Sequence, residues 1–160
     1  MKKEYNSLGQ VVLQNVALND LMPLIQERLA AGQQVRFSPQ GVSMLPMLRQ
    51  GKDTVVLSPA PEQLRKYDLP LFRMDSGKYV LHRVVRAGET YTCRGDNLYC
   101  TENNIRPDQI LAVVSGFSRN GVLYSTESLA YKIYCRVWVG SFPVRWFFYR
   151  VKRRMRRWLR

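Results

Sequence analysis

The sequence predicts a mainly β domain, in which short antiparallel strands form a barrel-like or coiled sheet. One helix is expected before the sheet and a helical hairpin after it. Two observations carry this prediction. Apolar residues change from helical spacing to alternation after Gly32, and turn-forming residues then separate short apolar runs. We expect one domain over residues 1–124, with its helix at about 20–31 and its β part at about 35–124, followed by basic amphipathic helices over 125–160.

The N-terminal helix is predicted from four apolar residues at the spacing of one helix face. Asn19 or Asp20 can cap its start, and Gly32 can end it. The four apolar residues are Leu21, Leu24, Ile25 and Leu29.

The strands are predicted from runs of β-branched and aromatic residues. The turn signal at residues 75–78 joins two of them as a hairpin. The expected strands cover residues 35–37, 53–57, 69–74, 79–85, 89–94, 110–117 and 121–124.

The chain after residue 124 is predicted to form two helices. Ser125 or Thr126 can cap the first, over residues 127–139, and Gly140 can end it. Ser141 can cap the second, with Pro143 in its first turn.

The charge is concentrated at the end of the chain. The net charge is +13, and residues 145–160 carry eight Lys or Arg residues and no acid. The rest of the chain has only a mild basic excess. There is no apolar stretch of signal-peptide length near the start and none long enough to span a bilayer. We therefore expect a protein that is cytoplasmic or peripheral on a membrane.

The three cysteines do not have the spacing of a zinc site, so we expect no metal and no cofactor. We interpret Cys93, Cys100 and Cys135 as free thiols. A Cys93–Cys100 bridge stays open if the chain is exported.

Three residues suggest nucleophilic catalysis. Ser43 follows a strand in a Gly-Val-Ser-Met-Leu-Pro turn, and His82 is the only histidine of the chain. A serine hydroxyl needs an adjacent base, and an imidazole can take its proton near neutral pH. Asp96, after the next strand, could orient the imidazole. Each segment alone is more often structural: a core histidine or an ordinary turn.

In their order, these segments resemble the motifs of type I signal peptidases and the LexA-like repressor peptidases. Ser43-Met44-Leu45-Pro46 is similar to the nucleophile box, and Arg94-Gly95-Asp96-Asn97 to the Gly-Asp-Asn box. His82-Arg83-Val84 matches the His-Arg-Val box of the endoplasmic-reticulum-type enzymes. Residues 51–55 and 66–72 resemble the two Gly-Asp-x-Val strands, with altered glycines. The resemblance covers about residues 37–114 and is closest to small bacterial signal-peptidase-like peptidases with a Ser/His active site. It implies a protein of the bacterial cytoplasm or one that is peripheral on the inner membrane.

The resemblance implies a coiled antiparallel β fold and a serine endopeptidase that cleaves leader-like or signal-like peptides after small residues. It implies Ser43 as nucleophile, His82 as general base and Asp96 as orienting acid. Gly41 and Met44 are the residues expected around the oxyanion and the substrate. The alternative is an inactive module of the same fold that binds peptide or a membrane surface. Self-cleavage at Ala31-Gly32 is a lesser alternative. This bond is too near Ser43 in sequence for the intervening segment to loop into the site.

Three interpretations of the basic tail stay open. It can pack on the sheet, it can bind an anionic membrane surface, or its arginines can neutralise nucleic-acid phosphates without sequence specificity. We expect the membrane surface as partner, beside the peptide substrate, because the tail is predicted to form a basic amphipathic helix that bears aromatic residues. The residues expected to contact lipid are Arg145, Trp146, Phe148, Arg153, Arg157 and Trp158.

Overall fold

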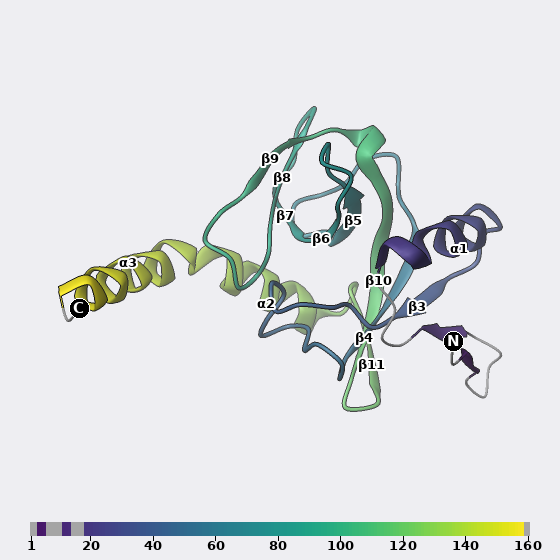
Figure 1. Cartoon of the computed structure of the whole chain (residues 1–160), viewed down its shortest axis with the longest axis horizontal. Helices are drawn as coiled ribbons and strands as arrows, with labels where there is room; N and C mark the ends of the chain where they lie inside the picture. The colour runs from purple at the N-terminus through teal and green to yellow at the C-terminus, as the bar shows by residue number, and fades with distance from the viewer. Residues whose placement is uncertain (1–2, 6–10, 14–17, 159–160) are drawn as a thin grey trace.

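A computed structural model describes residues 3–5, 11–13 and 18–158 as two β-sheets with three α-helices (Figure 1). The helices are α1 (Leu18–Ala30), α2 (Leu129–Gly140) and α3 (Phe142–Trp158). The strands are β1 (Lys3–Tyr5), β2 (Val11–Leu13), β3 (Val35–Phe37), β4 (Thr54–Pro59), β5 (Pro70–Arg73), β6 (Tyr79–Leu81), β7 (Arg83–Arg86), β8 (Tyr91–Arg94), β9 (Glu102–Ile105), β10 (Ile110–Arg119) and β11 (Val122–Ser125). The mainly β, mostly antiparallel architecture expected from the sequence is confirmed.

The large sheet is organised around β10. Within the described residues its order is β1-β2-β3-β4-β10-β5-β6, and β11 pairs with the end of β10. Of these pairs, β2–β3 is parallel and the others are antiparallel. A register shift between Val114 and Gly116 bends β10 where it pairs with β4. The small sheet has the order β7-β8-β9.

The main core lies between α1 and the large sheet. Met22 and Ile25 of α1 are buried, and alternate residues of β4, Val55 and Leu57, are fully buried in the same cluster. Burying each such side chain stabilises the fold by about 1.5–3 kcal/mol. A second cluster, which includes Phe72 and Val84, lies between the small sheet and β5. The helical and alternating patterns of the sequence therefore describe real buried faces.

The strand expected at residues 79–85 is in fact two strands that belong to different sheets. β6 pairs with β5 in the large sheet, and β7 pairs with β8 in the small sheet. His82 lies at the crossing between them. A continuous apolar run does not reveal where a chain leaves one sheet for another, which is why one strand was expected. β9 was not expected, because its sequence Glu-Asn-Asn-Ile reads as a turn.

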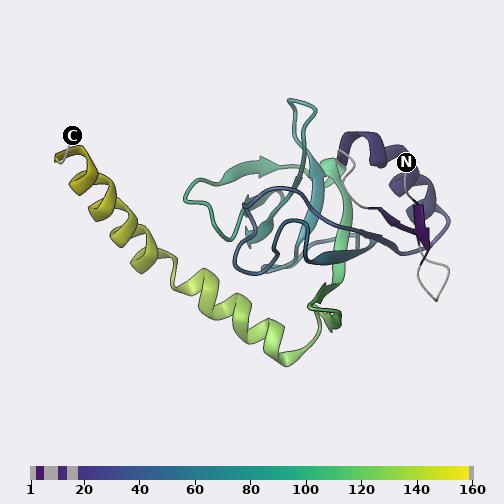
Figure 2. The same cartoon turned by 60° about the horizontal axis from the view of Figure 1, so that its bottom comes forward.

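The expected C-terminal hairpin is wrong, although both helices are present. α2 and α3 follow one another in an open bend, and α3 extends away from the body of the protein (Figure 2). One residue, Ser141, separates them, and its backbone is itself in the right-handed helical region. Helical hairpins use loops of 2–5 residues. The chain therefore has no loop with which to reverse.

The start of α2 lies two residues later than expected, and its cap is Ser128 in place of the expected Ser125 or Thr126. The hydroxyl of Ser128 accepts a hydrogen bond from the backbone N–H of Tyr131. None of the helices in the described part of the chain combines the length and apolar character needed to cross a bilayer.

The loop that joins β3 to β4 is closed by a buried carboxylate. Asp53 accepts hydrogen bonds from the backbone N–H of Arg49 at 2.8 Å and from its guanidinium at 2.6 and 3.0 Å. Burial alone would raise the pKa of Asp53, but the hydrogen bonds from Arg49 outweigh burial and hold this pKa below its ordinary value of 3.8. The stabilisation is therefore fully present above pH 3.8 and is lost as the pH falls through the folded-state pKa.

We predict that Asp53→Asn lowers the free energy of unfolding at pH 7 and that the difference from wild type shrinks below pH 3.8. Urea unfolding at a series of pH values measures both effects. Glu89→Gln, at an exposed acid, serves as the control and leaves the pH dependence unchanged. A constant difference between Asp53→Asn and wild type down to pH 2 would contradict this account.

Candidate active site

Ser43 lies in the loop between β3 and β4, in a turn held at several points. Met44 and Leu48 are buried in the main core, and the N–H of Leu48 donates to the carbonyl of Met44. The N–H of Gly41 donates to the side chain of Gln50 across the loop. Gly41 has φ +93°, a conformation that favours glycine. The apolar side chains thus fix the turn and leave Ser43 half-buried at its surface.

His82 is buried and held by a carboxylate that the sequence analysis did not select. Its Nδ1 lies 2.9 Å from Oε2 of Glu102, the first residue of β9. A neutral imidazole that donates its Nδ1–H to this carboxylate leaves Nε2 as a hydrogen-bond acceptor. Glu102 therefore favours the tautomer in which Nε2 can accept a proton.

The loop at residues 95–97 brings the serine turn and the imidazole together. The N–H of Asn97 donates to the carbonyl of Ser43 at 2.8 Å, and its side-chain amide donates to the carbonyl of Val42 at 3.1 Å. A Cβ placed on Gly95 would lie 2.7 Å from the carbonyl oxygen of Ser43 and 3.0 Å from Nε2 of His82. Both atoms therefore lie within a few ångströms of one point, and only glycine fits between them.

Asp96 does not contact His82, and the expectation that it orients the imidazole is corrected by the geometry. Its two carboxylate oxygens accept hydrogen bonds from Arg83 at 2.8 and 2.7 Å, and one also accepts from the hydroxyl of Tyr134 at 3.0 Å. Arg83 is fully buried. Successive residues of an extended chain point to opposite sides, so His82 and Arg83 face different partners. Asp96 neutralises the arginine, and Glu102 serves the histidine.

A cavity of about 490 Å³ opens at this site. Its walls bring together the expected residues Gly41, Ser43, Met44 and His82, and they also include Glu102. β6 forms one side of the cavity. Because β6 is the last strand of the large sheet, its outer edge is free of a partner strand among the described residues. Such an edge can accept an extended peptide.

Ser43 and His82 share the cavity, but no hydrogen bond joins the Ser43 hydroxyl to Nε2 among the described residues. Catalytic hydrogen bonds are often looser before substrate binds. The backbone N–H groups of Ser43 and Met44 also have no acceptor in the described part of the chain, so both can donate to an incoming oxyanion. Gly41 cannot donate in the same way, because Gln50 already accepts its N–H.

The residues expected to contact a membrane fall into three groups. Arg145 faces the protein: its guanidinium donates to the carbonyls of Asp96 and Trp138, so its expected lipid contact is replaced by an anchoring role. Trp146, Phe148 and Arg153 are exposed on α3. The side chains of Arg157 and Trp158 lie outside the described residues.

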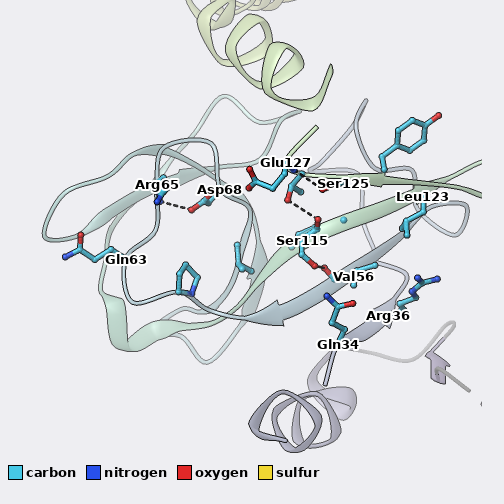
Figure 3. Close-up of a pocket in the computed structure, with 16 residues that line it drawn as sticks. Gln34, Arg36, Val56, Gln63, Arg65, Asp68, Ser115, Leu123, Ser125 and Glu127 are labelled. Atoms are coloured by element: carbon cyan, nitrogen blue, oxygen red, sulfur yellow. Dashed lines mark hydrogen bonds between the residues drawn. The ribbon is translucent and has the colours of Figure 1, made fainter. Parts of the chain in front are cut away.

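A second cavity, of about 660 Å³, lies on the other face of the large sheet (Figure 3). Some of its polar groups are paired within its own wall: the hydroxyl of Thr126 donates to the carbonyl of Ser115, and Asp68 accepts from the backbone N–H of Arg65. No histidine lines it. It therefore lacks the base that Ser115 or Ser125 would need as a nucleophile.

The cysteines and acids are also possible metal ligands. No cluster of His, Cys, Asp and Glu that could hold a metal occurs among the residues that the structure describes. All three cysteines are free, and Cys93 and Cys135 are buried whereas Cys100 is exposed. Burial, aided by the nearby charge of Glu102, raises the pKa of Cys93 to about 12, which keeps this thiol protonated and unreactive.

Comparisons with known proteins leave the site to be interpreted from its geometry. The chain matches no protein-family model, no curated protein and no solved structure.

We predict that Asp96→Asn destabilises the fold rather than acting on chemistry alone. The substitution leaves the buried charge of Arg83 without its counter-charge, and breaking such a pair costs about 3–5 kcal/mol. Urea unfolding measures the loss, with the exposed Asp108→Asn as the matched control. Wild-type stability in Asp96→Asn would contradict the structural role.

Proposed function

We propose that this protein is a serine endopeptidase, with Ser43 as nucleophile, His82 as general base and Glu102 as the carboxylate that orients the base. One observation carries the proposal: Nε2 of the single histidine faces the Ser43 turn across Gly95, while its Nδ1 is bonded to Glu102 in the same cavity. The resemblance of the Ser-Met-Leu-Pro, His-Arg-Val and Gly-Asp-Asn segments to signal peptidases and their relatives supports the same chemistry.

In this mechanism the imidazole of His82 acts first as a base and then as an acid in each half of the reaction. Nε2 of His82 takes the proton of the Ser43 hydroxyl as Oγ attacks the carbonyl carbon of the peptide bond. The imidazolium, stabilised by Glu102, then gives that proton to the leaving amine. A water molecule, deprotonated by the same Nε2, then attacks the acyl carbon, and the imidazolium gives this second proton to Oγ of Ser43 as the ester bond breaks.

The oxyanion of each tetrahedral intermediate needs donors that are fixed in advance. The backbone N–H groups of Ser43 and Met44 are the candidates, because neither has an acceptor among the described residues and the buried Met44 side chain fixes the turn. One such donor is worth about 3–4 kcal/mol of the reaction barrier.

The substrate is an extended peptide that lies along the free edge of β6. Main-chain hydrogen bonds to a strand edge bind a peptide with little dependence on its sequence, and side-chain pockets then select the cleavage position. The family resemblance favours cleavage after small residues in leader-like or signal-like peptides.

A second candidate function is a module that binds peptide in this cavity without cleaving it. The absence of a Ser43–His82 hydrogen bond among the described residues favours this candidate. Both candidates use the same cavity and the same strand edge, so only the reaction at Ser43 separates them.

We predict that the full chain cleaves an extended peptide with an Ala-x-Ala site. Ser43→Ala and His82→Gln should each reduce kcat/KM by about 10³-fold or more, because the nucleophile and its base act as a unit. Mass spectrometry of the products measures cleavage. Ser76→Ala, at an exposed serine outside the cavity wall, is the control and keeps its activity. If wild type binds the peptide but leaves it intact at several pH values, the binding module is the function instead.

We further predict that Glu102→Gln reduces kcat by about 10²–10⁴-fold with little change in KM, because the amide no longer fixes the tautomer or stabilises the imidazolium. Steady-state kinetics give both constants. Urea unfolding of the same variant separates this effect from instability. Equal kcat values for Glu102→Gln and wild type would remove Glu102 from the mechanism.

A further inference from the structure

The first two turns of α3 are fixed to the body of the protein through one side of the helix (Figure 2). Phe142, Arg145 and Tyr149 share this side at helical spacing. The ring of Tyr149 stacks on Tyr99 at 4.1 Å between centroids, and the guanidinium of Arg94 lies 3.4 Å from the centroid of the Phe142 ring. These contacts, with those of Arg145, set which way the rest of the helix faces.

The opposite side of α3 is an apolar stripe without a partner in the described chain. We define the stripe as Val144, Phe147, Phe148, Val151 and Met155, which repeat at the spacing of a single helix face. Their exposed fractions range from 41% to 65%. At 3.6 residues per turn, the stripe lies about half a turn away from the body-facing side. It therefore points into solvent while α3 is docked.

The neighbouring helix α2 also has an exposed apolar side. Tyr131, Tyr134 and Cys135 face the body, whereas three apolar residues at four-residue spacing are exposed on another side of the same helix. These exposed residues are Leu129, Ile133 and Val137. Both helices thus leave an apolar face uncovered, which soluble surfaces seldom do over such a length.

The remaining surface of α3 is basic. Arg150, Lys152, Arg153 and Arg154 are exposed on α3 outside the stripe, and residues 145–160 contain no acid. Two copies of this helix would bring these positive charges together, which disfavours pairing of the stripe with a second copy. A lipid surface with anionic headgroups can cover the apolar stripe and also balance the positive charge. It accepts apolar side chains at its boundary and attracts the arginines of the same helix.

We propose that α3 binds an anionic membrane surface and lies in its plane, with the apolar stripe at the boundary between headgroups and acyl chains. This inference goes beyond the proposed peptidase activity and does not depend on it. Arg145 and Trp138 both donate to the carbonyl of Asp96, next to Gly95 in the candidate active site. The helix that contacts lipid is therefore bonded to the loop that separates Ser43 from His82, and the membrane-bound protein holds its cavity at a fixed height above the lipid.

The test is co-sedimentation of the full chain with phosphatidylcholine vesicles, with and without phosphatidylglycerol. Wild type and Ser43→Ala should bind the anionic vesicles equally and the neutral vesicles weakly. Arg150→Gln, Arg153→Gln and Arg154→Gln together should lower the partition coefficient about 10²-fold, at roughly fivefold for each basic residue near the surface. Phe148→Ser with Val151→Ser should also release the protein. These side chains are exposed, so the substitutions leave the fold intact.

Two matched controls show whether binding depends on where the residues lie or only on the charge and apolar surface of the whole protein. Lys52→Gln, Lys66→Gln and Arg86→Gln remove the same charge from exposed sites on the body, and Val122→Ser with Leu123→Ser removes apolar groups that are equally exposed in β11. Both controls should bind as wild type does. Equal binding to neutral vesicles, no binding to anionic vesicles, or unchanged binding after Phe148→Ser with Val151→Ser would overturn the proposal. Binding of a DNA duplex in place of vesicles, through the same arginines, would overturn it in favour of nucleic acid.

Discussion

The buried ion pair between Arg83 and Asp96 is the interaction on which the rest of the structure depends. Burial alone would lower the pKa of Arg83, but its hydrogen bonds to Asp96 outweigh burial and hold the pKa well above the ordinary value. The arginine is therefore charged in the core and needs every partner it has. Those partners come from distant parts of the chain: Met47 of the serine loop, and Tyr131 and Cys135 of α2. One charge thus ties the small sheet, the serine loop and the C-terminal helices together.

The same ion pair also sets the geometry of the candidate active site. Arg83 follows His82 directly, and Asp96 lies between Gly95 and Asn97, so each half of the pair has site residues as its neighbours. The Asp96 carboxylate binds the arginine on one side of the loop. On the other side Gly95 approaches His82, and Asn97 donates to the carbonyl of Ser43. An interaction that stabilises the fold therefore positions groups proposed for catalysis, and stability and activity are coupled at this loop.

The sequence predicted much of this arrangement but assigned the wrong carboxylate to the histidine. Alternation and turn residues located most strands, and three short motifs selected Ser43, His82 and Asp96 as one site. The role of Glu102 depends on how β9 pairs with β8, where the register shifts between Tyr91 and Cys93. A shift of one residue turns a side chain to the other face of a sheet, and local sequence does not encode it. The signal against Asp96 was Arg83 itself, because an arginine in an apolar strand requires a counter-charge.

For the C-terminal helices, the sequence predicted the elements but not the direction in which their apolar sides face. Their amphipathic pattern was visible, but the pattern alone does not tell whether the apolar stripe of α3 covers the sheet or faces outward. The side chains that decide this are Phe142, Arg145 and Tyr149, which occupy the other side of α3 and bind it to the body. Because these contacts use aromatic and cationic groups, the body takes up one side of the helix and leaves the apolar stripe uncovered. A helix that is docked by its aromatic and cationic side has its apolar side free for a second surface. Because α3 also carries many basic residues and no acid from residue 145 on, an anionic surface is the best match.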